Sequence, residues 1–372
     1  MSDDTKHQAP PWSPPGEPIA YGYLALCRAG FEKEVAEELT AFARRVCLDG
    51  QVRATPGAAF VVFETREALP FADLADACDW QTLSFARQLL PWFARVDDLP
   101  DRDRATPIVA AARTAGQAFS ALLLETPDTD LAKQQSGFCR RFAEPLQLAL
   151  EKAGLHRTRG RQLAELHVLF SDTTTAWLCA ALPGRAALWP MGVPRLRMLH
   201  EAASRSTLKL AEALFTLLSE EERTSHLRAG LRAVDLGAAP GGWTWQLAHR
   251  GLNVTAVDNG PMAASVMATG MVEHVRADGF TWRPRRPVEW LVCDMVEQPS
   301  RVAALVADWI GSGRCRRSIF NLKLPMKKRL AEIEKCRALI HKRLAKVGPY
   351  DLRIKHLYHD RDEVTAYLAL QR

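Results

Sequence analysis

Short apolar segments alternate with amphipathic ones through the last part of the chain, from about residue 203. Strands are expected over residues 231–235, 253–258, 289–294, 318–323, 351–356 and 364–370, and helices over most of the gaps, for example 301–310 and 326–346. This alternation predicts a doubly wound, mostly parallel sheet of the Rossmann type. Only the short polar segment 358–362 separates the last two strands, which favours an antiparallel hairpin over a crossover.

The pattern is mixed in the first 182 residues. Residues 1–18 are rich in proline and are expected to form a disordered tail. Residues 19–100 predict a small α/β domain, with a strand at 21–27, a helix at 31–45, further strands within 58–63 and 82–96, and a short helix within 70–78. Residues 101–182 predict a second unit, with helices at 107–114 and 131–153 and strands at 118–124, 163–170 and 174–182. Proline and glycine then mark a linker, residues 183–202, before the domain at 203–372.

Composition adds only broad limits. A chain of 372 residues with 47% hydrophobic residues is long enough for two or three ordinary globular domains. The formal net charge of +6 favours a polyanionic partner weakly, since many basic proteins bind no nucleic acid. The eight cysteines are scattered without a C-x-x-C pair and are expected to be reduced thiols. Neither a secretion signal nor a long apolar run is evident, so a cytoplasmic location is expected.

The most informative segment is the turn from Val234 to Thr244, which reads VDLGAAPGGWT. An apolar strand enters a corner rich in glycine and proline, which lets the backbone approach a ligand closely, and a helix follows. The spacing matches neither a dinucleotide-binding G-x-G-x-x-G nor a phosphate-binding P-loop. Asp258 ends the next strand, about 20 residues on, where a carboxylate can accept hydrogen bonds from ribose hydroxyls. S-adenosylmethionine fits this combination.

Polar residues end several of the expected strands. In an open α/β sheet, ligands bind beyond the carboxyl ends of the strands, so these residues should meet at one edge. Each could singly be a solvated strand end, but their convergence favours a site. The set is Asp235, Asp258, Asp278, Asp294 and Lys323.

The glycine turn resembles that of the FtsJ-like ribose 2′-O-methyltransferases. Those enzymes carry a Lys-Asp-Lys-Glu tetrad, and the matching positions here are Lys209, Asp294, Lys323 and Glu363. Stretches at 27–34, 138–142, 257–263, 320–329 and 357–361 extend the likeness from about residue 22 to the C-terminus. They resemble the ribosomal RNA large subunit methyltransferase M family, with Ala239 in place of the cysteine of that family.

This resemblance implies a ferredoxin-like domain and a THUMP RNA-binding domain, followed by a Rossmann-fold methyltransferase domain. The implied activity is methylation of the ribose 2′-hydroxyl of a cytidine in the peptidyl-transferase region of 23S rRNA, with the rRNA or an early large-subunit precursor as partner. A monomer is expected, and no metal is required. Cofactor contacts are implied for Ser206, Gly237, Ala239, Pro240, Gly241, Gly242, Asp258, Asp278 and Asp294.

A ribose hydroxyl is a poor nucleophile, so its proton must be removed as it attacks the methyl group. Lysine ordinarily titrates near 10.4, and a second ammonium and partial burial favour its neutral form. We hypothesise that Lys323 is the base and Lys209 positions the hydroxyl, with Asp294 and Glu363 holding both lysines. The carboxylates oppose the lowering of the lysine pKa, and this balance is open at the level of sequence.

Basic residues suggest a path for RNA phosphates, although each could equally be solvated. The candidates are Arg140, Arg141, Arg157, Arg159, Arg161, Arg195, Arg197, Lys327 and Lys328, followed by Arg329. If they form a stripe, RNA binding should weaken steeply with salt.

Three other functions fit the sequence less well. Base-amino methyltransferases need a [DN]-P-P-[YF] segment where this chain has Asp294-Met295-Val296. Cytosine C5 methylation needs a nucleophilic cysteine, but Cys293 is expected to face the core because its side chain alternates with that of Asp294. An inactive RNA-binding assembly factor is disfavoured by the intact turn and complete tetrad.

Overall fold

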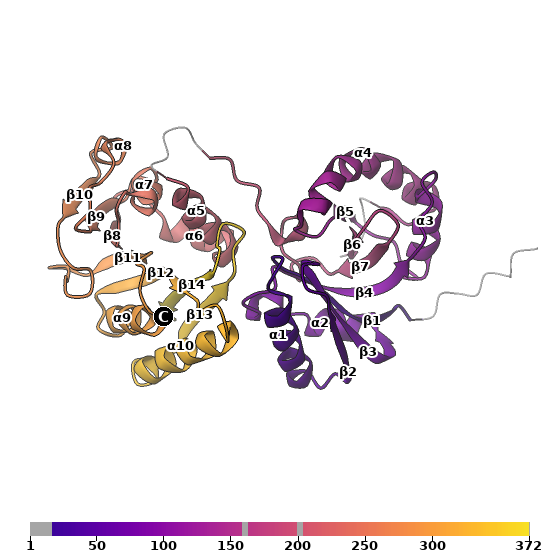
Figure 1. Ribbon diagram of the computed structural model, residues 1–372, viewed down its shortest axis with the longest axis horizontal. Helices are drawn as coiled ribbons and strands as arrows, with labels where there is room; N and C mark the ends of the chain where they lie inside the picture. The colour runs from indigo at the N-terminus through magenta and orange to yellow at the C-terminus, as the bar shows by residue number, and fades with distance from the viewer. Residues whose placement is uncertain (1–16, 158–162, 199–203, 372) are drawn as a thin grey trace, which may run out of the picture.

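The computed structural model describes residues 17–157, 163–198 and 204–371, so Arg159 and Arg161 lie outside the described residues. Within these ranges the chain forms two lobes, each built on a seven-stranded sheet (Figure 1). In the same ranges, no helix has both the length and the apolar character needed to cross a membrane.

The N-terminal lobe contains a mixed sheet in the order β2-β3-β1-β4-β7-β6-β5. Antiparallel pairing of β4 with β7 joins the strands predicted for the two N-terminal units into one sheet. Its strands are β1 (Ile19–Leu26), β2 (Gly50–Ala54), β3 (Phe60–Pro70), β4 (Gln88–Val96), β5 (Ala121–Glu125), β6 (Glu165–Phe170) and β7 (Ala176–Ala181). Its helices are α1 (Glu32–Arg45), α2 (Phe71–Ala77), α3 (Ala105–Arg113) and α4 (Asp130–Lys152), with short 3₁₀ turns η1 (Trp80–Thr82) and η2 (Pro190–Gly192).

The edge strand β2 was not predicted. Four of its five residues are exposed and Val52 is half-buried. An edge strand without a buried face leaves no hydrophobic alternation to detect.

The C-terminal lobe has the order β10-β9-β8-β11-β12-β14-β13. The first five strands are parallel, and β14 is antiparallel to both of its neighbours, which confirms the predicted terminal hairpin. The strands are β8 (Arg232–Leu236), β9 (Asn253–Val257), β10 (Val272–Val275), β11 (Val288–Cys293), β12 (Cys315–Lys323), β13 (Tyr350–Lys355) and β14 (Glu363–Leu370). The helices are α5 (Ser206–Leu217), α6 (Glu220–His226), α7 (Gly242–Ala248), α8 (Ala264–Met267), α9 (Pro299–Gly311) and α10 (Arg329–Leu344).

The β13–β14 hairpin of the C-terminal lobe lies against the N-terminal lobe (Figure 1). The side chain of Lys355 donates hydrogen bonds to the carbonyls of Trp80, Leu83 and Ala86. Arg87 donates in the opposite direction, to the carbonyls of His356 and Leu357. Each lobe thus donates side-chain hydrogen bonds to backbone carbonyls of the other, and these bonds orient the hairpin relative to the N-terminal sheet.

One residue of the predicted basic stripe belongs to this interface instead. Arg329 pairs with Glu34 at 3.0 Å and packs its guanidinium over the ring of Phe31. A guanidinium held by an ion pair and an aromatic ring contributes to lobe docking, so the expectation that Arg329 faces RNA is wrong.

Candidate active site

The glycine turn lies between β8 and α7. Gly237 and Gly241 have φ values of 76° and 111°, a backbone region that favours glycine. A Cβ atom on Gly237 would lie 2.6 Å from Cγ of Met295. The turn is stabilised by Asp258, whose carboxylate accepts hydrogen bonds from the amides of Ala239 (3.1 Å) and Gly260 (2.7 Å). The loop therefore presents backbone rather than side chains to the space beyond the sheet.

A cavity of about 390 Å³ opens at this edge of the sheet. Five of the predicted cofactor residues line it, namely Gly237, Ala239, Asp258, Asp278 and Asp294. The other predicted contacts, Pro240, Gly241 and Gly242, continue the turn into α7. Ser206 touches the turn as well, since its Oγ lies 2.2 Å from where a Cβ on Gly242 would be. The predicted cofactor residues therefore gather at one edge of the sheet, in the cavity or in the turn beside it.

Asp235 departs from the expected arrangement. It lies inside β8 rather than at its end, is 1% exposed and is not among the residues that line this cavity. Its Oδ2 accepts a 2.6 Å hydrogen bond from the Thr244 hydroxyl of α7. Burial, together with the charges of Asp294 and Asp258, raises the pKa of Asp235 to about 7. The expectation of a strand-end residue at the ligand is wrong for Asp235, which instead ties the strand to the helix after the turn.

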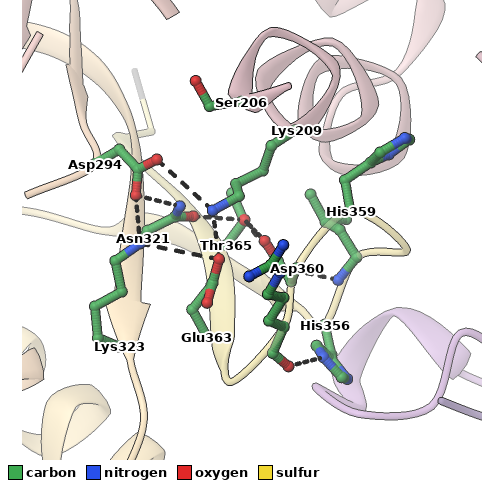
Figure 2. Close-up of polar contacts among 12 residues, drawn as sticks. Ser206, Lys209, Asp294, Asn321, Lys323, His356, His359, Asp360, Glu363 and Thr365 are labelled. Atoms are coloured by element: carbon green, nitrogen blue, oxygen red, sulfur yellow. Dashed lines mark hydrogen bonds and ion pairs between the residues drawn. The ribbon is translucent and has the colours of Figure 1, made fainter. Parts of the chain in front are cut away.

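The four predicted catalytic side chains meet beside the cavity (Figure 2). Lys209 comes from α5, Asp294 follows β11, Lys323 ends β12 and Glu363 begins β14. Lys323 Nζ lies 2.6 Å from Asp294 Oδ1 and 3.9 Å from Glu363 Oε1. Lys209 Nζ pairs with Glu363 and lies 3.6 Å from Asp294 Oδ2. Each of the two lysines thus pairs with both carboxylates.

Strand register accounts for the pairing. Lys323 and Glu363 are direct partners in the antiparallel ladder of β12 and β14. Opposed residues on one face of a sheet have adjacent side chains, so the hairpin brings Glu363 to Lys323. Asp294 arrives from β11, the parallel neighbour of β12 on the other side.

The two lysines have different surroundings. The Lys209 side chain is 9% exposed, against 26% for Lys323. Burial lowers the pKa of Lys209, but the acidic surroundings, with Asp294 foremost and Glu363 hydrogen-bonded to it, outweigh burial and raise this pKa above its usual value. Lys209 therefore stays charged at neutral pH, whereas Lys323 stands nearer to solvent.

Sequence reasoning missed three buried polar residues behind this cluster, Asn321, Thr365 and Asp360, each 0% exposed. Asn321 and Thr365 oppose one another in the ladder, two pairs along from Lys323 and Glu363 and therefore on the same face. The signal was the period of two: Asn-Leu-Lys and Glu-Val-Thr each place polar residues on one face and a buried apolar residue on the other. Asp360 carried no such signal, because an acid in a short polar loop is ordinarily solvated.

Cys293 faces the core, as predicted. It is 0% exposed, and burial raises the pKa of its thiol to about 12. A thiol in this state is a poor nucleophile, which argues against cytosine C5 chemistry here.

The turn, the cavity and the tetrad define a methyltransferase with an FtsJ-like catalytic domain, and the FtsJ-like methyltransferase family model matches residues 202–321. Two further models match the N-terminal lobe: the RlmM ferredoxin-like domain over residues 21–90, and the N-terminal domain of ribosomal RNA large subunit methyltransferase M over residues 103–182.

Relatives match along nearly the whole chain. The ribosomal RNA large subunit methyltransferase M of Aromatoleum aromaticum is 77% identical over 352 residues, covering 95% of this chain and 96% of the relative. That of Thauera aminoaromatica is 65% identical over 351 residues, covering 94% and 96%. The chain belongs to the ribosomal RNA large subunit methyltransferase M family, and its methyl donor is S-adenosylmethionine.

The residues present fit that donor. The cavity volume lies in the range of about 300 to 1,000 Å³ that small-molecule sites occupy. Asp258 would hold the ribose hydroxyls, and the exposed Asp278 lines the same cavity together with Gly237 and Ala239. Among the described residues, no lysine lines the cavity, in keeping with a nucleoside that lacks phosphate.

Proposed function

We propose that this protein methylates the ribose 2′-hydroxyl of a cytidine in the peptidyl-transferase region of 23S rRNA, with Lys323 as the general base. The observation that supports this most is the position of the Lys209–Asp294–Lys323–Glu363 cluster at the end of the cavity that Asp294 also lines. The choice of cytidine, and of its position in the rRNA, rests on the resemblance of this chain to the family.

Each residue of the cluster has a distinct task. Bound S-adenosylmethionine supplies an electrophilic methyl group. Lys323, the more exposed lysine, takes the hydroxyl proton on Nζ once it is neutral. Asp294 orients that nitrogen through the 2.6 Å contact. Lys209 keeps its charge and stabilises the developing alkoxide, while Glu363 fixes Lys209 from the opposite side.

RNA is proposed to reach the site across exposed cations of both lobes. Arg140, Arg141, Arg157, Arg195, Arg197, Lys327 and Lys328 are all exposed. Arg195 lies over the ring of Tyr358, at 5.4 Å, and so stands next to the β13–β14 loop. Replacing Arg195 and Arg197 by alanine should reduce the steepness with which RNA affinity falls as salt rises, by about one unit of log–log slope for each phosphate that the variant no longer neutralises. An unchanged slope would remove both residues from the path.

The remaining expectations complete the proposal. The chain divides at about residues 19–100 (ferredoxin-like), 101–182 (THUMP), 183–202 (linker) and 203–372 (methyltransferase). It acts as a monomer in the cytoplasm, where large-subunit rRNA or its early precursors are found. The proposed chemistry uses side chains alone and requires no metal.

The test combines one variant with one nucleoside assay. Lys323→Ala should lower the rate of methyl transfer about 10²- to 10⁴-fold, while calorimetric binding of S-adenosylmethionine and binding of RNA stay unchanged. Lys346→Ala, at an exposed lysine of the same lobe, is the control. Mass spectrometry of 23S rRNA from cells lacking the gene should show loss of one 2′-O-methylcytidine. Wild-type turnover by Lys323→Ala, or a methyl group on a base, would refute the proposal.

A further inference from the structure

A chain of buried polar contacts extends from the catalytic cluster into the β13–β14 loop (Figure 2). Asn321 Nδ2 donates to Asp294 Oδ1 at 2.7 Å. The Thr365 hydroxyl lies 2.7 Å from Asn321 Oδ1 and 3.1 Å from both carboxyl oxygens of Asp360. The catalytic carboxylate is thereby connected to a second, fully buried carboxyl group.

The direction of the hydrogen bonds follows from the number of protons each group owns. The ionised carboxylate of Asp294 can only accept, so Asn321 must turn its NH₂ toward Asp294 and its Oδ1 toward Thr365. Asn321 Oδ1 can also only accept, so Thr365 gives it its single hydroxyl proton. Thr365 must then accept from Asp360, which requires a proton on that carboxyl group.

That proton has one place to reside. Asp360 Oδ2 accepts a 3.0 Å hydrogen bond from the Leu357 amide, so the proton belongs on Oδ1, facing Thr365. The surroundings agree with this protonation state. Burial raises the pKa of Asp360 well above its usual value, with Glu363 and Glu212 acting in the same direction, and Lys209 and the Leu357 amide opposing them.

The backbone around Asp360 is held from both lobes. Arg28 of the N-terminal lobe donates to the carbonyl of Asp360 at 2.8 Å. From α5, Glu212 accepts hydrogen bonds from the amides of Tyr358 and His359 at 2.7 and 3.0 Å. Asp360 is therefore a fixed end for the chain of contacts rather than part of a loose loop.

We propose that Asp360 is a neutral positioning acid, which orients the Asp360–Thr365–Asn321–Asp294 chain in one direction and so aims Asp294 at Lys323. If Asp360 were ionised, Thr365 would donate to it instead, and Asn321 Oδ1 would lose its donor. The buried amide could then rotate and turn an oxygen toward Asp294. The inference rests on the proposed roles of Asp294 and Lys323.

The decisive comparison is Asp360→Asn with Asp360→Ala. Asparagine reproduces the neutral acid, because its NH₂ can donate to Thr365 while its oxygen accepts from the Leu357 amide. We expect Asp360→Ala to lower kcat about 10- to 100-fold with an unchanged KM for S-adenosylmethionine, since misplacement of a catalytic group has effects of this size. Asp360→Asn should recover most of that loss.

A second pair of variants, at Thr365, keeps the test valid if Asp360→Ala fails to fold. Thr365→Val removes the hydroxyl and should lower kcat to a similar extent, whereas Thr365→Ser retains the hydroxyl and should keep kcat within about threefold of wild type. Carbon-13 NMR of labelled aspartate gives a direct readout: the Asp360 carboxyl resonance, identified by its absence from Asp360→Asn, should stay at the position of the protonated acid near neutral pH.

An Asp360→Asn variant as slow as Asp360→Ala, or a resonance at the position of a carboxylate, would overturn the inference, because Asp360 would then act as a negative charge beside Lys209. This failure is distinguishable from failure of the proposed function. The latter would appear as wild-type turnover by Lys323→Ala or as methylation elsewhere than the ribose, whichever residue stands at position 360.

Discussion

The contact of Lys355 with the N-terminal lobe gives a prediction whose size can be worked out. Lys355 is 3% exposed and donates to three carbonyls, at 2.6 Å for Leu83 and 2.9 Å for Ala86 among them. It also lies 4.3 Å from the centre of the Trp80 ring. Lys355→Met retains most of the apolar length of the side chain and removes the donors and the charge.

The magnitude follows from what is left behind. The Trp80 carbonyl keeps a 3.2 Å hydrogen bond from the Leu83 amide, so the loss falls mainly on the carbonyls of Leu83 and Ala86. An unsatisfied buried acceptor costs about 1–3 kcal/mol, which gives about 2–6 kcal/mol for two. Methionine avoids the desolvation of an ammonium and offsets part of this. We expect the free energy of unfolding to fall by about 3 kcal/mol.

Urea unfolding followed by circular dichroism measures this change, and hydrogen exchange of residues 80–87 locates it. The exposed Lys346→Met should stay within about 0.5 kcal/mol of wild type. The buried Glu38, whose carboxylate accepts from the amides of Ser84 and Phe85, lies in the field of Lys355. Adding Glu38→Gln to Lys355→Met should therefore show a coupling of about 1 kcal/mol. The reasoning would be refuted if Lys355→Met lowered the free energy of unfolding by less than about 1 kcal/mol and showed no coupling to Glu38→Gln.

Two further predictions concern the turn. Because the pKa of Asp235 is raised in the folded state to about 7, the native protein binds a proton there that the unfolded chain releases at lower pH, so the stability from this group is lost as pH rises through about 7. Asp235→Asn cannot ionise, and its free energy of unfolding should fall less than that of wild type between about pH 5 and pH 8. Gly237→Ala places a methyl group against Met295 at a positive φ and should weaken binding of S-adenosylmethionine about tenfold, as measured by calorimetry.

Each of the two has its own control. Gly230→Ala has a similar φ of 83° with no atom within 4 Å of the new Cβ, so it separates backbone strain from the steric effect at the turn, and it should leave cofactor affinity unchanged. Equal affinity of Gly237→Ala and wild type would show that the turn is not where the donor binds. Identical pH profiles for Asp235→Asn and wild type would show that Asp235 is ionised in the fold.

The predictable part of the molecule is the part with a local signal. The hairpin follows from the short gap before Glu363. Asp294 and Lys323 were expected at strand ends, and the full set of four catalytic positions followed from the resemblance to the FtsJ-like tetrad. Asn321 and Thr365 carried a period-two signal that was recognisable only once the two strands were known to pair. The contacts between the lobes left no signal in the sequence. Arg87 and the His356 carbonyl, for example, are 269 residues apart, and each looks like an ordinary polar group.

The continuous N-terminal sheet has a consequence for substrate choice. Since β4 pairs with β7 in the same sheet that holds β1 and β3, the N-terminal lobe is built on one continuous sheet, and Arg28 of this lobe donates a hydrogen bond to the β13–β14 loop. On the proposed RNA path, RNA bound by the N-terminal lobe would be held at a set distance from Lys323. We would then expect the enzyme to select its nucleotide by the distance between two contact points on a folded RNA, with little reading of the base itself.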